Sequence, residues 1–118
     1  MMRAMSTDCI FCKIAAGTIP ANRLYEDDDT LAFADLNPQA PAHLLVIPKQ
    51  HLTSLAHATP DHQQLLGRLL SAAAEVARQQ DLDNGYRVVI NTGSDGGQTV
   101  SHLHLHVLGK RAMHWPPG

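Results

Sequence analysis

Apolar and polar residues alternate strictly over residues 102–107, within the run 101–108 near the C-terminus. Successive side chains of a β-strand point to opposite faces, so residues two apart share a face. The pattern predicts a strand whose core-facing side chains are apolar, namely Leu103, Leu105 and Val107. The other face carries imidazoles in register, from His102, His104 and His106. A rigid row of this kind suits a catalytic or metal site.

The remaining apolar patterns predict four further strands and two helices. Short apolar or alternating runs indicate strands over residues 23–26, 31–35, 44–47 and 86–91. An apolar stripe at helical spacing predicts a helix over about residues 60–80, which Thr59 caps and Pro60 opens. A shorter helix is predicted over residues 9–17, ending at Gly17. The fold class is therefore α+β: an antiparallel sheet of about five strands with one long helix and a short N-terminal helix.

Composition is that of an ordinary globular protein. The 118 residues fit one domain, residues 1–118, with a loose lead-in over residues 1–8 and a C-terminal tail over residues 109–118. A net charge of −2 without a basic stripe argues against a nucleic-acid polymer as partner, but a small nucleotide is compatible with it. No apolar run approaches the roughly 20 residues that span a bilayer. We expect a cytoplasmic protein with no membrane partner, whose cysteines are reduced thiols.

The histidine run and the loop before it are the main candidates for chemistry. A plain half-buried strand rarely repeats His at its polar positions, so we expect either a metal cluster or nucleophilic and acid–base chemistry by imidazole. The Gly-rich loop over residues 92–99 fits neither a P-loop nor the G-x-G-x-x-G pattern. Hydrogen-bond donors in this loop favour binding of an anionic phosphoryl group beside an imidazole. These donors belong to Gly96, Gly97, Gln98 and Thr99. Cys9 and Cys12 have the spacing of a metal-binding or a redox pair.

Residues 102–108 read His-Leu-His-Leu-His-Val-Leu, which resembles the signature of the histidine triad superfamily, His-φ-His-φ-His-φ-φ. Further similar stretches lie at residues 10–14, 31–36, 38–49 and 91–98, and in the tail at residues 113–118. The tail narrows the resemblance to the HINT branch, the histidine triad nucleotide-binding proteins. The resemblance covers residues 8–118, nearly the whole chain.

This resemblance implies a homodimeric purine nucleoside phosphoramidase, a hydrolase of adenosine 5′-phosphoramidates and aminoacyl-AMP. By position, His104 is the nucleophile, which would form a covalent nucleotidyl-histidine intermediate that water then hydrolyses. His106 and His43 would contact phosphate or orient the nucleophile, and Thr99 would lie near the leaving group. The implied catalytic set is His43, Thr99, His102, His104 and His106.

The resemblance also implies nucleotide-binding and metal residues. Asp35 matches the acid that binds the ribose, and Trp115 lies in the tail that would reach the active site of the partner subunit. The base pocket and the phosphate cradle would be formed by Phe11, Ile14, Phe33, Leu36, Asn91, Gly97, Gln98, Thr99, Val100, His104 and His106. Many bacterial-type members bind structural zinc at positions that are here Cys9, Cys12, His51 and His102. No organic cofactor is expected.

Other functions compete with this interpretation. The three histidines could hold a catalytic metal ion, or the protein could bind AMP as a regulatory module with little turnover. It could also hydrolyse dinucleoside polyphosphates, as a sister branch does, although the HINT-like tail argues against this. The intact triad argues against the branch that transfers nucleotidyl groups. Two positions depart from the family pattern: Thr99 stands where many HINT proteins have Ser, and Ala34 where some have His.

Overall fold

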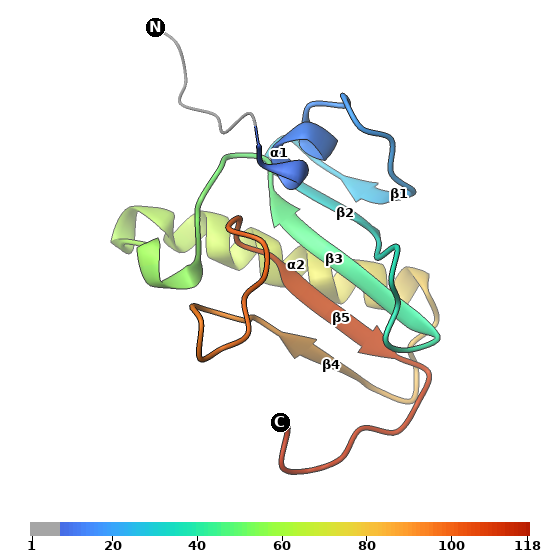
Figure 1. Cartoon of the computed structure of the whole chain (residues 1–118). Helices are drawn as coiled ribbons and strands as arrows, with labels where there is room; N and C mark the ends of the chain where they lie inside the picture. The colour runs from blue at the N-terminus through green and yellow to red at the C-terminus, as the bar shows by residue number, and fades with distance from the viewer. Residues whose placement is uncertain (1–7) are drawn as a thin grey trace, which may run out of the picture.

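Five antiparallel strands form one sheet in the order β1-β2-β3-β5-β4 (Figure 1). The strands are β1 (Arg23–Glu26), β2 (Thr30–Ala34), β3 (Ala42–Pro48), β4 (Tyr86–Val89) and β5 (Leu105–Gly109). The helices are α1 (Ile10–Ala15) and α2 (Gln63–Gln79), with the 3-10 turns η1 (Leu55–His57) and η2 (Pro60–His62). This computed structural model describes residues 8–118, so nearly all of the predicted lead-in over residues 1–8 lies outside the described residues. The predicted α+β architecture is confirmed.

The two faces of the sheet carry different layers. Because side chains alternate along β3, Leu44 and Val46 pack with the long helix α2, whereas Leu45 and Ile47 pack with α1 on the opposite face. Figure 1 shows α2 behind the sheet and α1 near one end of its other side. His106 pairs with Leu45 across β3 and β5 and therefore belongs to the α1 face. The long helix stabilises the sheet from one side and leaves the other for the site.

The histidine run is not a continuous strand, which corrects the prediction for residues 101–108. Strand β5 begins at Leu105, opposite Val46, and residues 101–104 lie outside it. Pro48, which ends β3, has no N–H to extend the ladder. Its oxygen accepts instead from the imidazole of His102, at 2.8 Å. The apolar alternation nevertheless holds, since Leu103, Leu105 and Val107 are all buried.

The remaining elements agree with the prediction apart from their ends. Thr59 caps η2, which leads into α2, so the predicted helix over residues 60–80 begins as a 3-10 turn. Gly17 follows α1 with φ of +81°, a conformation that favours glycine. Strand β4 is shorter than predicted and ends at Val89. Within residues 8–118, no helix is long and apolar enough to cross a membrane.

Candidate active site

The sheet register brings the side chains of His43 and His106 together. His43 lies opposite Leu108 and Leu45 lies opposite His106, so the two histidines are diagonal neighbours on one face. Nε2 of His43 is 2.9 Å from Nδ1 of His106. The ring of His104, just before β5, has its centroid 5.0 Å from that of His106. Three imidazoles therefore lie side by side on the α1 face of the sheet.

Hydrogen bonds determine which nitrogen of His43 and of His106 carries the proton. The main-chain N–H of Gln39 donates to Nδ1 of His43 at 2.9 Å, so a neutral His43 carries its proton on Nε2. That N–H donates to Nδ1 of His106, and Oδ2 of Asp35, 3.3 Å away, is a second acceptor. A neutral His106 therefore carries its proton on Nε2, where it can be donated to a bound ligand.

His104 has the opposite arrangement. Its Nδ1 lies 2.6 Å from the main-chain oxygen of His102, which can only accept a hydrogen bond. Nδ1 therefore carries the proton, and Nε2 keeps the lone pair that a nucleophile needs. Phe11 contacts this ring edge-on, with centroids 5.1 Å apart, and limits its rotation. The site thus combines an unprotonated ring nitrogen on His104 with a hydrogen-bond donor on His106.

Burial favours the uncharged form of the imidazoles that this arrangement requires. Burial lowers the pKa of His106 to about 4, and the neighbouring rings of His104 and His43 act in the same direction. Burial also lowers the pKa of His43, although the carboxylate of Asp35 opposes the shift. At neutral pH, His43 and His106 are therefore neutral and keep the proton arrangement described above.

A cavity of about 390 Å³ opens in front of the histidines. One part of its lining is apolar and comes from α1, β2 and β3, and the other part is polar and holds two histidines of the triad. The cavity gathers these predicted residues: Phe11, Ile14, Phe33, Asp35, Leu36, His43, Thr99, Val100, His104 and His106. Leu36 contributes only to the rim, being 92 % exposed. The lining therefore offers an apolar pocket beside a carboxylate and imidazoles.

Two residues at the end of the Gly-rich loop, Thr99 and Val100, carry unpaired donors. Among residues 8–118, neither the hydroxyl of Thr99 nor the main-chain N–H of Val100 has a hydrogen-bond partner. Both residues line the cavity. Because unpaired polar groups gain most from a polar ligand, an anionic group in the cavity would be bound here.

Three other predicted ligand residues brace the loop and do not line this cavity. Their donors reach main-chain oxygens: Asn91 to Gly96, Gly97 to Ser94, and Gln98 to both Thr53 and Val100. The loop is tight, because a Cβ at Gly96 would lie 2.3 Å from the main-chain oxygen of Thr92. Trp115, 83 % exposed in the tail, also lies outside the cavity lining. The predicted contacts of these residues with a nucleotide stay predictions.

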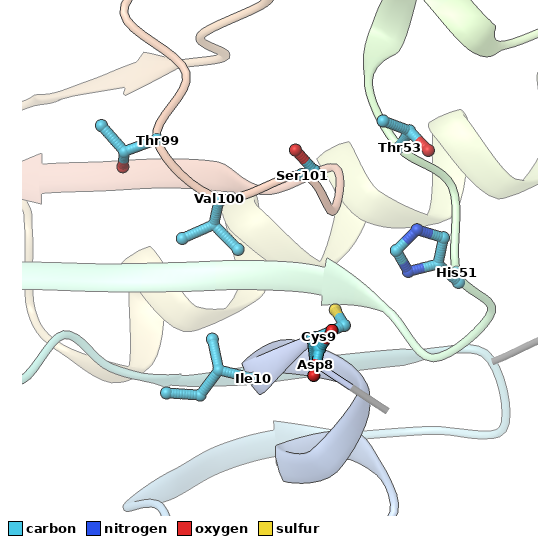
Figure 2. Close-up of a pocket in the computed structure, with 8 residues that line it drawn as sticks. All are labelled: Asp8, Cys9, Ile10, His51, Thr53, Thr99, Val100 and Ser101. Carbon is cyan, nitrogen blue, oxygen red and sulfur yellow. The ribbon is translucent and has the colours of Figure 1, made fainter. Parts of the chain in front are cut away.

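Cys9, Cys12, His51 and His102 form a second cluster beside the histidines. Nδ1 of His102 lies 3.2 Å from Sγ of Cys9 and 3.6 Å from Sγ of Cys12, and Nδ1 of His51 lies 3.2 Å from Sγ of Cys12. Figure 2 shows Cys9 and His51 lining a second cavity, of about 410 Å³. Thr99 and Val100 line this cavity as well. The cluster therefore adjoins the candidate active site.

The donor set of this cluster fits a tetrahedral zinc ion. Zn–S and Zn–N bonds of about 2.3 and 2.0 Å place sulfur and nitrogen about 3.5 Å apart, close to the separations found here. All four ligand atoms lie within 4.8 Å of one another. Nε2 of His102 donates to the oxygen of Pro48, which leaves Nδ1 with a lone pair for a metal. Burial lowers the pKa of His102 to about 4, which also favours the neutral ring that a metal binds.

The geometry argues against a catalytic metal on the histidine triad. The ring of His102 is directed to the cysteines, so the triad members do not form one ligand group among the described residues. Asp35, His43 and His106 do lie close enough together to be considered as ligands. However, Nδ1 of His43 accepts a hydrogen bond, so its Nε2 is protonated and cannot also bind a metal.

Comparison with known proteins identifies the family of this chain. Residues 16–113 match the HIT domain family. The chain belongs to the HIT family. A 14 kDa zinc-binding protein of Zea mays is 51 % identical over 120 residues, covering 100 % of this chain and 94 % of that protein. The crystal structure of a HIT family hydrolase from Legionella pneumophila superposes with a TM-score of 0.91 at 50 % identity, over 94 % of this chain and 100 % of that one.

A histidine triad nucleotide-binding protein from Candida albicans is also similar, with a TM-score of 0.78 and 33 % identity over 94 % of this chain and 85 % of that one.

Sequence reasoning missed groups that organise this HIT site. The N–H of Gln39 and the oxygens of Pro48 and His102 belong to the main chain, and they determine the protonation of the histidines. No side-chain pattern reports such groups, because every residue type carries them.

Proposed function

We propose that this HIT protein belongs to the HINT branch and hydrolyses purine nucleoside 5′-phosphoramidates and aminoacyl-AMP through a covalent intermediate on His104. The observation that carries the proposal is the 2.6 Å contact between Nδ1 of His104 and the oxygen of His102. It leaves Nε2 of His104 with a lone pair in a ring that lines the cavity. The hydrolase from Legionella pneumophila and the nucleotide-binding protein from Candida albicans support the same class.

The reaction would proceed by two displacements at phosphorus. In the first, Nε2 of His104 forms a bond to the α-phosphorus and the bond to the leaving group breaks: the P–N bond of a phosphoramidate, whose nitrogen takes up a proton from solvent, or the P–O bond of aminoacyl-AMP, which releases a carboxylate. In the second, water attacks the phosphorus and gives up a proton to solvent, the bond to His104 breaks, and AMP is released. The Nε2–H of His106, the N–H of Val100 and the hydroxyl of Thr99 would donate to phosphoryl oxygens as negative charge develops.

The rest of the cavity would select the nucleoside. The apolar side chains of Phe11, Ile14 and Phe33 form a pocket suited to a planar base. Asp35 already accepts from the N–H of Asn37 through Oδ1, at 2.8 Å. A carboxylate has further lone pairs, so Asp35 can also accept from the ribose hydroxyls. These contacts favour a ribonucleotide as the bound half of the substrate.

The proposal includes a structural zinc ion and a homodimer. Cys9, Cys12, His51 and His102 would hold zinc with all four ligand positions filled by protein, so the ion would supply folding free energy and would not touch the substrate. The zinc-binding protein of Zea mays supports this assignment.

Trp115 can contact a neighbouring subunit, because its side chain is exposed and lies in the tail. We propose that it contributes to the site of the partner subunit.

A comparison of substrates tests the proposed function. We expect the protein to release amine and AMP from an adenosine 5′-phosphoramidate at a higher kcat/KM than it cleaves a dinucleoside polyphosphate. A guanosine phosphoramidate should also be cleaved, whereas the cytidine compound should be a poorer substrate. The variant His104→Gln should bind AMP but release no amine, because it lacks the nucleophile.

Two results of this comparison would contradict the proposal. Faster cleavage of the dinucleoside polyphosphate would favour the sister branch of the superfamily. AMP binding without turnover of any compound would favour a regulatory binding module. His57→Gln, which changes an exposed histidine outside the cavity lining, is the matched control and should leave turnover unchanged.

A further inference from the structure

The peptide unit between His102 and Leu103 has contacts on both of its sides. Its oxygen accepts from Nδ1 of His104, and its N–H donates to the oxygen of Leu52 at 2.6 Å. The first contact sets the proton of His104, and the second fixes the plane of the peptide that provides it. The protonation of His104 therefore depends on how firmly the segments around His102 and Leu52 are held together.

The cysteine–histidine cluster holds both of these segments. His102 precedes the peptide unit and His51 precedes Leu52, and the ring centroids of the two histidines are 4.9 Å apart. Both have Nδ1 directed to cysteine sulfurs. Each of the two hydrogen-bonded main-chain segments is therefore attached, through the adjacent residue, to the same group of four ligand atoms.

The third segment held by the cluster is the beginning of α1. Cys9 and Cys12 flank Phe11, whose ring contacts both His102 and His104 edge-on, with centroids 5.8 and 5.1 Å apart. Moving the cysteines would move Phe11 and loosen the packing of the His104 ring. The cluster is thus connected to His104 by two routes, one through the peptide unit and one through Phe11.

We propose that the Cys9–Cys12–His51–His102 cluster is a positioning site for His104: when it holds its metal, it keeps the lone pair of His104 on Nε2. Loss of the metal, or of one ligand, lets the His102–Leu103 peptide turn and lets His104 populate the other tautomer. In that tautomer, Nε2 is protonated and cannot attack phosphorus. This inference rests on His104 being the nucleophile, but its effect on the tautomer is measurable without turnover.

The experiment uses His51→Gln in the full chain, because the ring of His51 contacts Cys12 and His102 and is connected to His104 through this cluster. His57→Gln is the matched control. Zinc content, the imidazole nitrogen NMR spectrum, kcat, KM and the Kd for AMP are measured for each. We expect His51→Gln to lose zinc and to show His104 as a mixture of tautomers. Its kcat should fall about tenfold or more, as for other residues that orient a ligand through a second residue.

The KM and the Kd for AMP should change less than kcat in His51→Gln, because His51 does not line the nucleotide cavity and the cluster reaches that lining only through Phe11 and its helix. A zinc-free variant that keeps the single His104 tautomer would overturn the proposal, and so would one that keeps the wild-type kcat. If His51→Gln does not fold or keeps its zinc, the wild type treated with a chelator and then with Zn²⁺ replaces it: the tautomer mixture should appear without zinc and disappear with it, and a single tautomer throughout would overturn the proposal. Absence of turnover in the wild type would refute the proposed function alone, since the tautomer measurement still decides this inference.

Discussion

At the scale of single residues, the position of one proton distinguishes His104 from His106. A main-chain oxygen holds the proton of His104 on Nδ1, whereas the N–H of Gln39, acting through His43, holds that of His106 on Nε2. The two rings therefore present opposite hydrogen-bonding character. An unprotonated nitrogen beside a donor is the combination that the proposed displacement at a phosphoryl group requires.

A double-mutant cycle tests the path from His43 to His106. His43→Ala removes the donor to Nδ1 of His106, so His106 loses its fixed tautomer, and we expect kcat to fall by about tenfold to a hundredfold. His106→Ala should have at least as large an effect. Because His43 acts through His106, the double variant should be no slower than His106→Ala, which steady-state kinetics measures. Additive losses would show that His43 acts independently.

The lowered pKa of His106 predicts how stability depends on pH. Its folded-state pKa, about 4, lies below the ordinary value of 6.5, so between these values the unfolded chain binds more protons. The free energy of unfolding should therefore rise as pH increases from 4 to 6.5, and the contribution of His106 is fully present above that range. Relative to His106→Asn, the wild type should gain about 1–2 kcal/mol over this range, after allowance for solvent screening.

Urea denaturation of both proteins at several pH values measures this difference. Parallel curves of unfolding free energy against pH for the wild type and His106→Asn would contradict the lowered pKa of His106.

The residue types of the site could be predicted from the sequence, but the positions of the protons on the histidines could not. They depend on Gln39 and Pro48, whose relevant groups are main-chain atoms, and on burial that only the folded chain creates.

At the scale of elements, Thr59 illustrates a feature that the sequence predicts well. Its side chain accepts from the N–H of Asp61, and Nδ1 of His62 accepts from the N–H of Thr59, which completes a capping box. Thr59→Ala should lower the free energy of unfolding by about 1 kcal/mol, because two donors lose or weaken their partners. Chemical denaturation measures the change. Ser71→Ala, on an exposed position of α2, is the control and should change stability by less than about 0.5 kcal/mol.

The histidine run illustrates what sequence patterns cannot predict at this scale. Alternation predicted the buried faces of Leu103, Leu105 and Val107 correctly, because burial is what alternation reports. It failed to show that the strand begins only at Leu105. That limit depends on Pro48 in the neighbouring strand, which lies more than fifty positions away along the chain. A local pattern holds no information on such a long-range contact.

At the scale of the whole molecule, the cysteine–histidine cluster joins three segments that are distant in sequence. They are the beginning of α1, the loop after β3 and the segment before β5. We expect close to one zinc ion per subunit by metal analysis, and none in the double variant Cys9→Ser/Cys12→Ser. Removing the metal should lower Tm, because binding free energy is lost from the folded state only.

A metal-free wild type with unchanged Tm would contradict the proposed structural role of zinc.

The spacing of Cys9 and Cys12 alone allowed either metal or redox chemistry, and the histidine partners followed only from the family resemblance. The structure brings all four residues together, and it does so through the sheet and α1. The five-stranded fold itself was predictable, because strong local patterns define almost every element.

The most direct test of the central claim is detection of a covalent bond between His104 and AMP. The protein is mixed with an adenosine 5′-phosphoramidate, quenched within the first turnovers, and analysed by intact mass and peptide mapping beside His104→Ala. We predict an adduct of one AMP on the peptide that contains His104, formed before steady-state release of AMP, and no adduct or turnover in the variant. Turnover that survives in His104→Ala, or an adduct on another residue, would contradict the account.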